Sequence, residues 1–142
     1  LIKLTLPNAI VIHCNRNPLD TCLSIFEQNF LIKGNEYTFD LNEIGNYYKL
    51  YKNCLNHWNE ILINNFYEIK YENFVKNQEQ ETRKLLKFCS LKFEKNCISF
   101  YKNKSVVRTA SVYQVRKKIY SSSINKAAAY KIELSNLKKI LN

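Results

Sequence analysis

The segment from Ile10 to Ser24, IVIHCNRNPLDTCLS, places a guanidinium and hydroxyl groups where a strand is expected to give way to a helix. The apolar run Ile10–Ile12 predicts a strand buried on both faces of a parallel sheet. Pro18 suits the first turn of a helix, because the N–H that it lacks would be unpaired there anyway. Helix N-termini favour anions, and Arg16 can bind a phosphate through two parallel hydrogen bonds. The segment therefore predicts an anion site built from Arg16 and a hydroxyl of the following helix.

A second feature that could do chemistry is the basic region toward the end of the chain. The net charge is +10, and residues 102–142 hold ten Lys and Arg against one acid. Within residues 102–126, hydroxyl side chains are interspersed with cations and no steady apolar period is present. Such a stretch is typical of a loop that wraps a phosphate and equally of a disordered basic linker, and its charge also suits nucleic acid. Composition alone leaves these alternatives open.

The cysteines and histidines do not form a metal-binding pattern. The five cysteines contain no C-x-x-C pair, and the two histidines stand apart, so no metal is expected. An odd number of cysteines on apolar helix faces favours buried, reduced thiols, and hence a cytoplasmic protein. Cys14 is not expected to be a nucleophile, because no histidine is placed to activate it. No apolar run is long enough to span a membrane.

Alternating strands and helices must position these residues. Apolar spacing predicts helices over residues 18–32, 41–62, 79–89, 94–101 and 126–141. The alternating stretch FYEIKYENF predicts a second strand over residues 66–74. Asp40 is a good N-cap for the clearest helix, with Glu43 placed to complete a capping box, and the apolar stripe of that helix is expected to lie in the core. The order of elements predicts one helix-rich α/β domain over residues 1–142.

Three segments of the chain resemble a known family. RNPLDTCLS, YENFV and VRTASVYQVRKKIY are similar, in this order, to motifs of bacterial sulfotransferases related to tyrosylprotein sulfotransferase, which often follow tetratricopeptide repeats. The resemblance implies a fold akin to the P-loop nucleoside kinases. It also implies transfer of a sulfuryl group from 3′-phosphoadenosine 5′-phosphosulfate (PAPS) to an acceptor hydroxyl.

The resemblance also assigns roles to individual residues. Arg16 and Ser24 match residues that hold the 3′-phosphate of the donor, and Tyr71 matches a tyrosine that lines the adenosine site. Ser111 begins a loop, ending at Tyr120, that closes over the donor, and Ser111 is expected to contact the transition state. The donor-binding residues implied in this way are Arg16, Ser24, Tyr71, Ser111, Gln114, Val115, Lys117, Tyr120 and Lys126.

The chain also departs from the family pattern. Its two glycines, Gly34 and Gly45, lie in or beside expected helices, so the Gly-containing loop that cradles the phosphosulfate has no counterpart here. The first strand, this loop and the general base are expected to precede Leu1. Gln28 replaces an arginine, Lys118 replaces a proline, and alanines at 127–129 replace an aromatic residue. We therefore expect the C-terminal part of a sulfotransferase domain, inactive by itself.

Two other functions are compatible with the sequence. A small nucleic-acid-binding module would use the basic region and the ten tyrosines, but the tyrosines fall largely on core-like stripes, so nucleic acid is not the expected partner. A nucleotide or carbohydrate kinase of similar fold would need a G-K-[ST] loop, which is absent. The acceptor is left open between a protein tyrosine, a carbohydrate hydroxyl and a small molecule.

Overall fold

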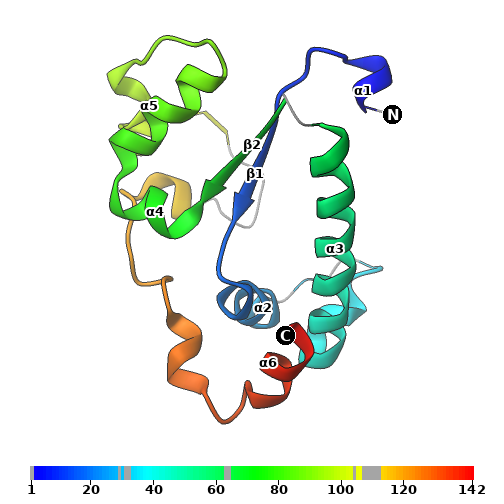
Figure 1. Cartoon of the computed structure of the whole chain (residues 1–142). Coiled ribbons are helices and arrows are strands. Elements are labelled where there is room, and N and C mark those ends of the chain that lie inside the picture. The colour runs from blue at the N-terminus through cyan, green and yellow to red at the C-terminus, as the bar shows by residue number, and fades with distance from the viewer. Residues whose placement is uncertain (1, 29, 31–32, 63–64, 104, 107–112) are drawn as a thin grey trace. The chain divides into compact units, whose positions relative to one another are not determined.

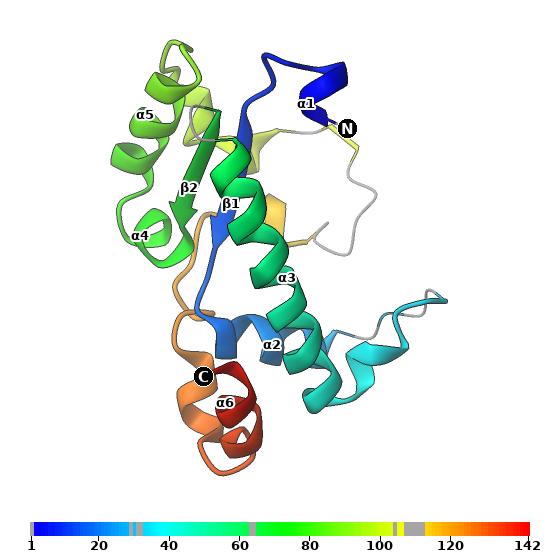
Figure 2. The same ribbon diagram turned by 45° about the vertical axis from the view of Figure 1, so that its right-hand side comes forward.

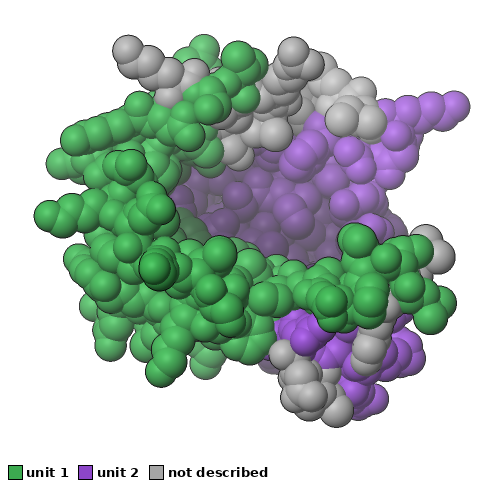
Figure 3. Space-filling model, turned by 90° about the horizontal axis from the view of Figure 1, so that it is seen from above, with its two compact units in different colours: residues 1–15, 67–121 green, residues 16–66, 122–142 purple. Residues whose placement is uncertain are grey.

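The computed structural model describes residues 2–28, 30, 33–62, 65–103, 105–106 and 113–142. The chain forms two compact units, which are coloured separately in Figure 3. Unit 1 comprises Leu1–Asn15 and Tyr67–Ser121, and unit 2 comprises Arg16–Phe66 and Ser122–Asn142. Each unit is thus assembled from two separate stretches of chain. The expectation of a single domain stays a prediction.

Unit 1 contains the sheet. Strands β1 (Val11–Asn15) and β2 (Phe66–Lys70) are hydrogen-bonded neighbours, and their arrows point the same way in Figure 1. The short helix α1 (Ile2–Thr5) precedes β1, while α4 (Tyr71–Lys76) and α5 (Gln78–Phe88) follow β2. The ring of Tyr67 in β2 lies 4.9 Å from that of Phe88 in α5, centroid to centroid. The fold is therefore mixed α/β and rich in helices.

The first strand differs from its prediction in both extent and burial. It continues through His13 and Cys14 to Asn15, where the sequence predicts a polar turn. Ile10 and Ile12 are 38% and 47% exposed, whereas alternate residues of the strand are half-buried. The expectation of burial on both faces is wrong, because successive side chains point to opposite faces and only one of them is covered.

Two further elements of unit 1 end earlier than predicted. The second strand stops at Lys70, and Tyr71 begins α4, because Tyr71, Phe74 and Val75 fit helical spacing as well as alternation. The helix expected over residues 94–101 consists instead of two 3₁₀ turns, Lys95–Cys97 and Phe100–Lys102. The helix expected over residues 79–89 is confirmed as α5, displaced by one residue at each end.

Unit 2 is built around the contacts of α2 (Pro18–Glu27), α3 (Leu41–Ile61) and α6 (Ser135–Leu141). Two 3₁₀ segments, η1 (Glu36–Phe39) and η5 (Lys126–Tyr130), lie between them in sequence. The core consists of small and aliphatic side chains from α2, α3, η5 and the end of the chain: Cys22, Leu23, Ile44, Ala127, Leu134 and Leu137. Helix α2 is shorter than predicted, because it ends at Glu27 and Gln28 is its extended C-cap.

Helix α3 matches its prediction closely. The side chain of Asp40 accepts hydrogen bonds from the backbone N–H groups of Asn42 and Glu43, at 2.7 and 3.0 Å, so the predicted N-cap is confirmed. The apolar stripe is buried at Ile44 but is open farther along, where Trp58 is 44% exposed. The expectation that the whole stripe lies in a core therefore holds only for the first half of the helix.

Helix α6 packs on the first half of α3, as Figures 1 and 2 both show. A Cβ atom at Gly45 would lie 2.9 Å from Cδ1 of Leu137 and 3.0 Å from Cγ2 of Ile140. The amide of Asn136 also donates to the side-chain oxygen of Asn42 at 2.6 Å. The close approach of the two helices therefore depends on the absence of a side chain at Gly45.

The predicted C-terminal helix is divided in two. Residues of η5 form a 3₁₀ segment, a turn follows, and α6 begins only at Ser135. In the described residues, no helix combines the length and the apolar character needed to cross a membrane.

Candidate functional site

The start of α2 is shaped by local sequence. Oδ1 of Asn17 accepts a hydrogen bond from the backbone N–H of Asp20 at 3.1 Å, and Pro18 occupies the first turn. The hydroxyl of Thr21 donates to the carbonyl oxygen of Asn17 at 2.9 Å. The proton of this hydroxyl, one of those in the helix that could contact an anion, is therefore already used within the helix. The helix start predicted around Pro18 is confirmed.

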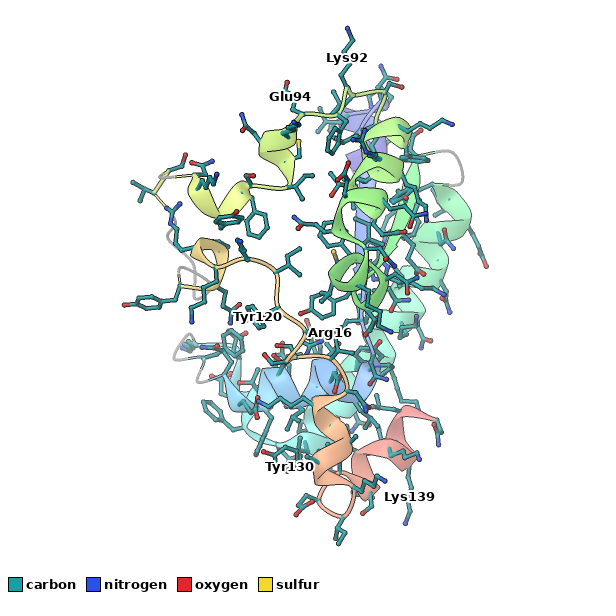
Figure 4. All side chains as sticks on the ribbon, turned by 90° about the vertical axis from the view of Figure 1, so that its left-hand side faces the viewer. Arg16, Lys92, Glu94, Tyr120, Tyr130 and Lys139 are labelled. Atoms are coloured by element: carbon teal, nitrogen blue, oxygen red, sulfur yellow. The ribbon has the colours of Figure 1, made fainter. Side chains whose placement is uncertain are left out.

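Arg16 lies two residues before α2 and is half-buried (Figure 4). Its Nη2 donates a hydrogen bond to the carbonyl oxygen of Ser123 at 2.8 Å. A guanidinium carries five N–H donors, so this contact is compatible with a second contact to an anion. Arg16 therefore joins the start of α2 to the segment that precedes η5.

Asp20, in the first turn of α2, is buried, with 2% of its surface exposed. Its two carboxylate oxygens accept hydrogen bonds from backbone N–H groups of the distant segment, from Asn125 at 2.7 Å and from Ala127 at 2.8 Å. Asn125 adopts the left-handed conformation, with φ at 59°, which asparagine tolerates better than most residues. Residues 123–127 are thus held along α2 by three hydrogen bonds.

Lys126 lies between the two residues that Asp20 binds. Its Nζ contacts both carboxylate oxygens of Glu27, the last residue of α2, at 2.6 and 2.5 Å. Ser24 is exposed and follows Asp20 by four residues, with Glu27 three residues later, so all three lie on one face of the helix. The structure therefore places Ser24 and the ammonium of Lys126 on one face of α2, with Arg16 just before the helix; we call this set of groups the α2 face.

The groups on the α2 face have the chemistry of an anion site. A guanidinium, an ammonium and a hydroxyl can each donate hydrogen bonds to phosphate oxygens. No group of three or more His, Cys, Asp or Glu side chains suited to a metal ion occurs in the described residues. The arrangement can bind and orient an anion.

The remaining predicted residues belong to unit 1. Tyr71 is half-buried and is the first residue of α4. Gln114 and Val115 lie in the 3₁₀ turn η4 (Gln114–Arg116), while Lys117 and Tyr120 follow it and are exposed. Arg116 donates to the carbonyl oxygen of Ser105. Ser111 lies outside the described residues, and the donor-binding roles of all these residues stay predictions.

The thiols correct one expectation. All five cysteines are free, but only Cys22 is fully buried, and Cys14, Cys54 and Cys97 are exposed. Cys14 and Cys97 belong to unit 1 and Cys54 to the second half of α3, and the spacing of apolar residues did not show that these positions are exposed. Burial raises the pKa of the Cys22 thiol from 9.0 to about 11, so this group stays protonated and is a packing residue of α2.

Sequence reasoning missed Asp20, Asn125 and Glu27. An acid in the first turn of a helix is ordinarily explained by the helix dipole, so Asp20 gave no separate signal. Its partners are 105 and 107 residues away, and single-sequence patterns do not show such pairings. The N–D pair Asn17 and Asp20 is visible as a capping pattern, and this is the signal that could have drawn attention to the helix start.

Comparison with known proteins identifies a family for this chain. Residues 1–95 match the family model described as the sulfotransferase family. An uncharacterized protein of Aquifex aeolicus (strain VF5) is 39% identical over 143 residues, an alignment that covers 99% of this chain and 19% of that protein. The chain thus spans about a fifth of the length of this curated relative, and no solved structure gives a significant match. Because the family match covers more than half of its residues, the chain belongs to the sulfotransferase family.

Proposed function

We propose that this chain is the donor-binding part of a sulfotransferase that transfers a sulfuryl group from PAPS to an acceptor hydroxyl. Membership of the sulfotransferase family supports the reaction class. The observation that carries the proposal is the α2 face, to which the distant segment 123–127 is bound through the contact of Arg16 with Ser123 and that of Lys126 with Glu27. The proposed ancestry is that of P-loop nucleotide kinases, within the group related to tyrosylprotein sulfotransferase.

The α2 face suits the 3′-phosphate of the donor. A phosphate monoester carries nearly two negative charges near neutral pH, and two cations with one hydroxyl can compensate them. Glu27 holds Lys126 in an ion pair whose side chains are 42% and 38% exposed, lysine first. Such a pair contributes little stability, so an incoming phosphate can compete for Lys126.

The other donor contacts are assigned by resemblance. Tyr71 would pack against adenosine, since aromatic rings stack on bases or contact their edges. Ser111, Gln114, Val115, Lys117 and Tyr120 would form the loop over the donor, where cations can stabilise charge that develops on the leaving phosphate. The bound donor would supply the electrophilic sulfuryl group. A protein tyrosine, a sugar hydroxyl or a small alcohol is the proposed acceptor.

Calorimetry with adenosine 3′,5′-bisphosphate tests the proposal on the 142-residue chain. We expect binding of this nucleotide to exceed that of adenosine 5′-monophosphate, which lacks the 3′-phosphate. Arg16→Ala removes one charge-assisted contact and should weaken binding of the bisphosphate by about 1.5–3 kcal/mol. Arg16→Lys keeps the charge but loses the forked geometry, so its affinity should be intermediate.

Lys139→Ala is the matched control, since it removes a cation from α6 in the same unit (Figure 4). This variant should bind the bisphosphate as the unchanged chain does. Equal affinity for the two nucleotides, or an Arg16→Ala variant that binds as tightly as Lys139→Ala, would exclude the role assigned to the α2 face.

A further inference from the structure

Asp20 is a charged residue where the fold would ordinarily place an apolar one. It is 2% exposed and its neighbours in the helix, Cys22 and Leu23, belong to the core of unit 2. Burying a carboxylate is costly unless hydrogen bonds compensate its charge. Here two backbone N–H groups do so, at 2.7 and 2.8 Å. The charge is therefore retained for a specific pairing.

This pairing determines where Lys126 lies. Asn125 and Ala127 each donate to a different oxygen of Asp20, and Lys126 is the residue between them. Ala127 is 7% exposed, and its side chain belongs to the core. With the backbone fixed on both sides, the side chain of Lys126 is directed outward along the α2 face, where it reaches Glu27.

The same pairing supports Arg16. Its contact with the carbonyl of Ser123 requires that the segment lie along α2, and Asp20 fixes that segment two residues farther on. Arg16 and Asp20 thus bind one continuous stretch of backbone, Arg16 through a carbonyl and Asp20 through N–H groups. A change at Asp20 would release a stretch that both cations of the α2 face depend on.

We propose that Asp20 is a positioning residue of the nucleotide site, which holds residues 123–127 so that Arg16 and Lys126 can both contact a phosphate bound at the α2 face. The inference rests on the proposed function, because the phosphate is that of the sulfuryl donor. Asp20 itself does not touch the ligand. Its effect on binding is transmitted through the backbone at Asn125 and Ala127.

The test uses Asp20→Asn, which preserves shape but turns one acceptor oxygen into an NH₂ group that faces a backbone N–H. We expect faster hydrogen exchange at the amides of Asn125 and Ala127. Affinity for adenosine 3′,5′-bisphosphate should fall about tenfold or more, while affinity for adenosine 5′-monophosphate should change less than twofold. A purely structural role would lower stability without changing this ratio of affinities.

Asp40→Ala is the matched control, because Asp40 also accepts two backbone hydrogen bonds in unit 2 but does so as the N-cap of α3. It should lower the midpoint of urea unfolding, with no change in nucleotide preference. If the unchanged chain fails to bind the bisphosphate, the proposed function and this inference both fall. If Arg16→Ala loses binding but Asp20→Asn retains it, or if exchange at 125 and 127 is unaltered, only the inference falls.

Discussion

Glu27 competes with any anion for the ammonium of Lys126. The carboxylate of Glu27 satisfies the ammonium that the proposed function assigns to a phosphate. Because both side chains are partly exposed, the pair is worth on the order of 1 kcal/mol or less. A phosphate at the α2 face would therefore displace Glu27 at a small cost.

The first prediction concerns this residue. Glu27→Gln should raise the affinity for adenosine 3′,5′-bisphosphate about two- to fivefold, since the competing charge is lost. Calorimetry at low and high salt measures it, and the gain should shrink at high salt. Glu60→Gln makes the same change of charge at an exposed position near the end of α3. An equal gain in that variant would show that net charge, and not the Lys126 pair, sets the affinity.

At the scale of residues, sequence reasoning identified the cations but not what holds them. Arg16 was predicted from its place between a strand and Pro18, a position that local rules describe. Asp20 forms its pairs through contacts that depend on the fold of residues 123–127, including the left-handed turn at Asn125. The spacing of residues within one element cannot predict hydrogen bonds between elements that are far apart in the sequence.

At the scale of elements, α3 and α5 were the most predictable, because long stripes, an N-cap at Asp40 and i,i+4 pairs are local properties. The short elements were not. The helix predicted over residues 126–141 begins as a 3₁₀ segment, and α6 starts only at Ser135.

The pairing of α3 with α6 gives a prediction at this scale. Gly45→Val should lower the free energy of unfolding by roughly 1–3 kcal/mol, because the new side chain would overlap Leu137 and Ile140. Urea unfolding followed by the fluorescence of Trp58, the single tryptophan and a residue of α3, measures it. Asn46→Val puts the same β-branched residue at the adjacent exposed position of the helix. Equal losses in the two variants would show that overlap with Leu137 and Ile140 is not the cause.

At the scale of the whole molecule, the 142 residues lack a glycine-rich phosphate loop. Gly34 has φ at 96° and an open surrounding, and Gly45 lies inside α3, so neither glycine forms a phosphosulfate cradle. The chain also spans 19% of its Aquifex relative, and activity is a property that we propose for a longer protein.

The corresponding prediction concerns turnover. The 142-residue chain, incubated with PAPS and a tyrosine peptide or a sugar acceptor, should transfer no sulfate above background, because it has no cradle to orient the phosphosulfate. A competent sulfotransferase in the same assay serves as the positive control. Sulfate on either acceptor would show that the chain carries a complete reaction centre.

The hydrogen bonds of Arg16 and Asp20 with residues 123–127 also bear on how the protein is made. They connect positions 105 and 107 residues apart, with most of unit 1 lying between them in the sequence. Contacts of such long range close a large loop and form late in folding. During synthesis, α2 leaves the ribosome long before its partner segment exists. The α2 face is therefore completed only after residues 123–127 have been synthesised, so a ligand of this face cannot guide the folding of the segments made before them.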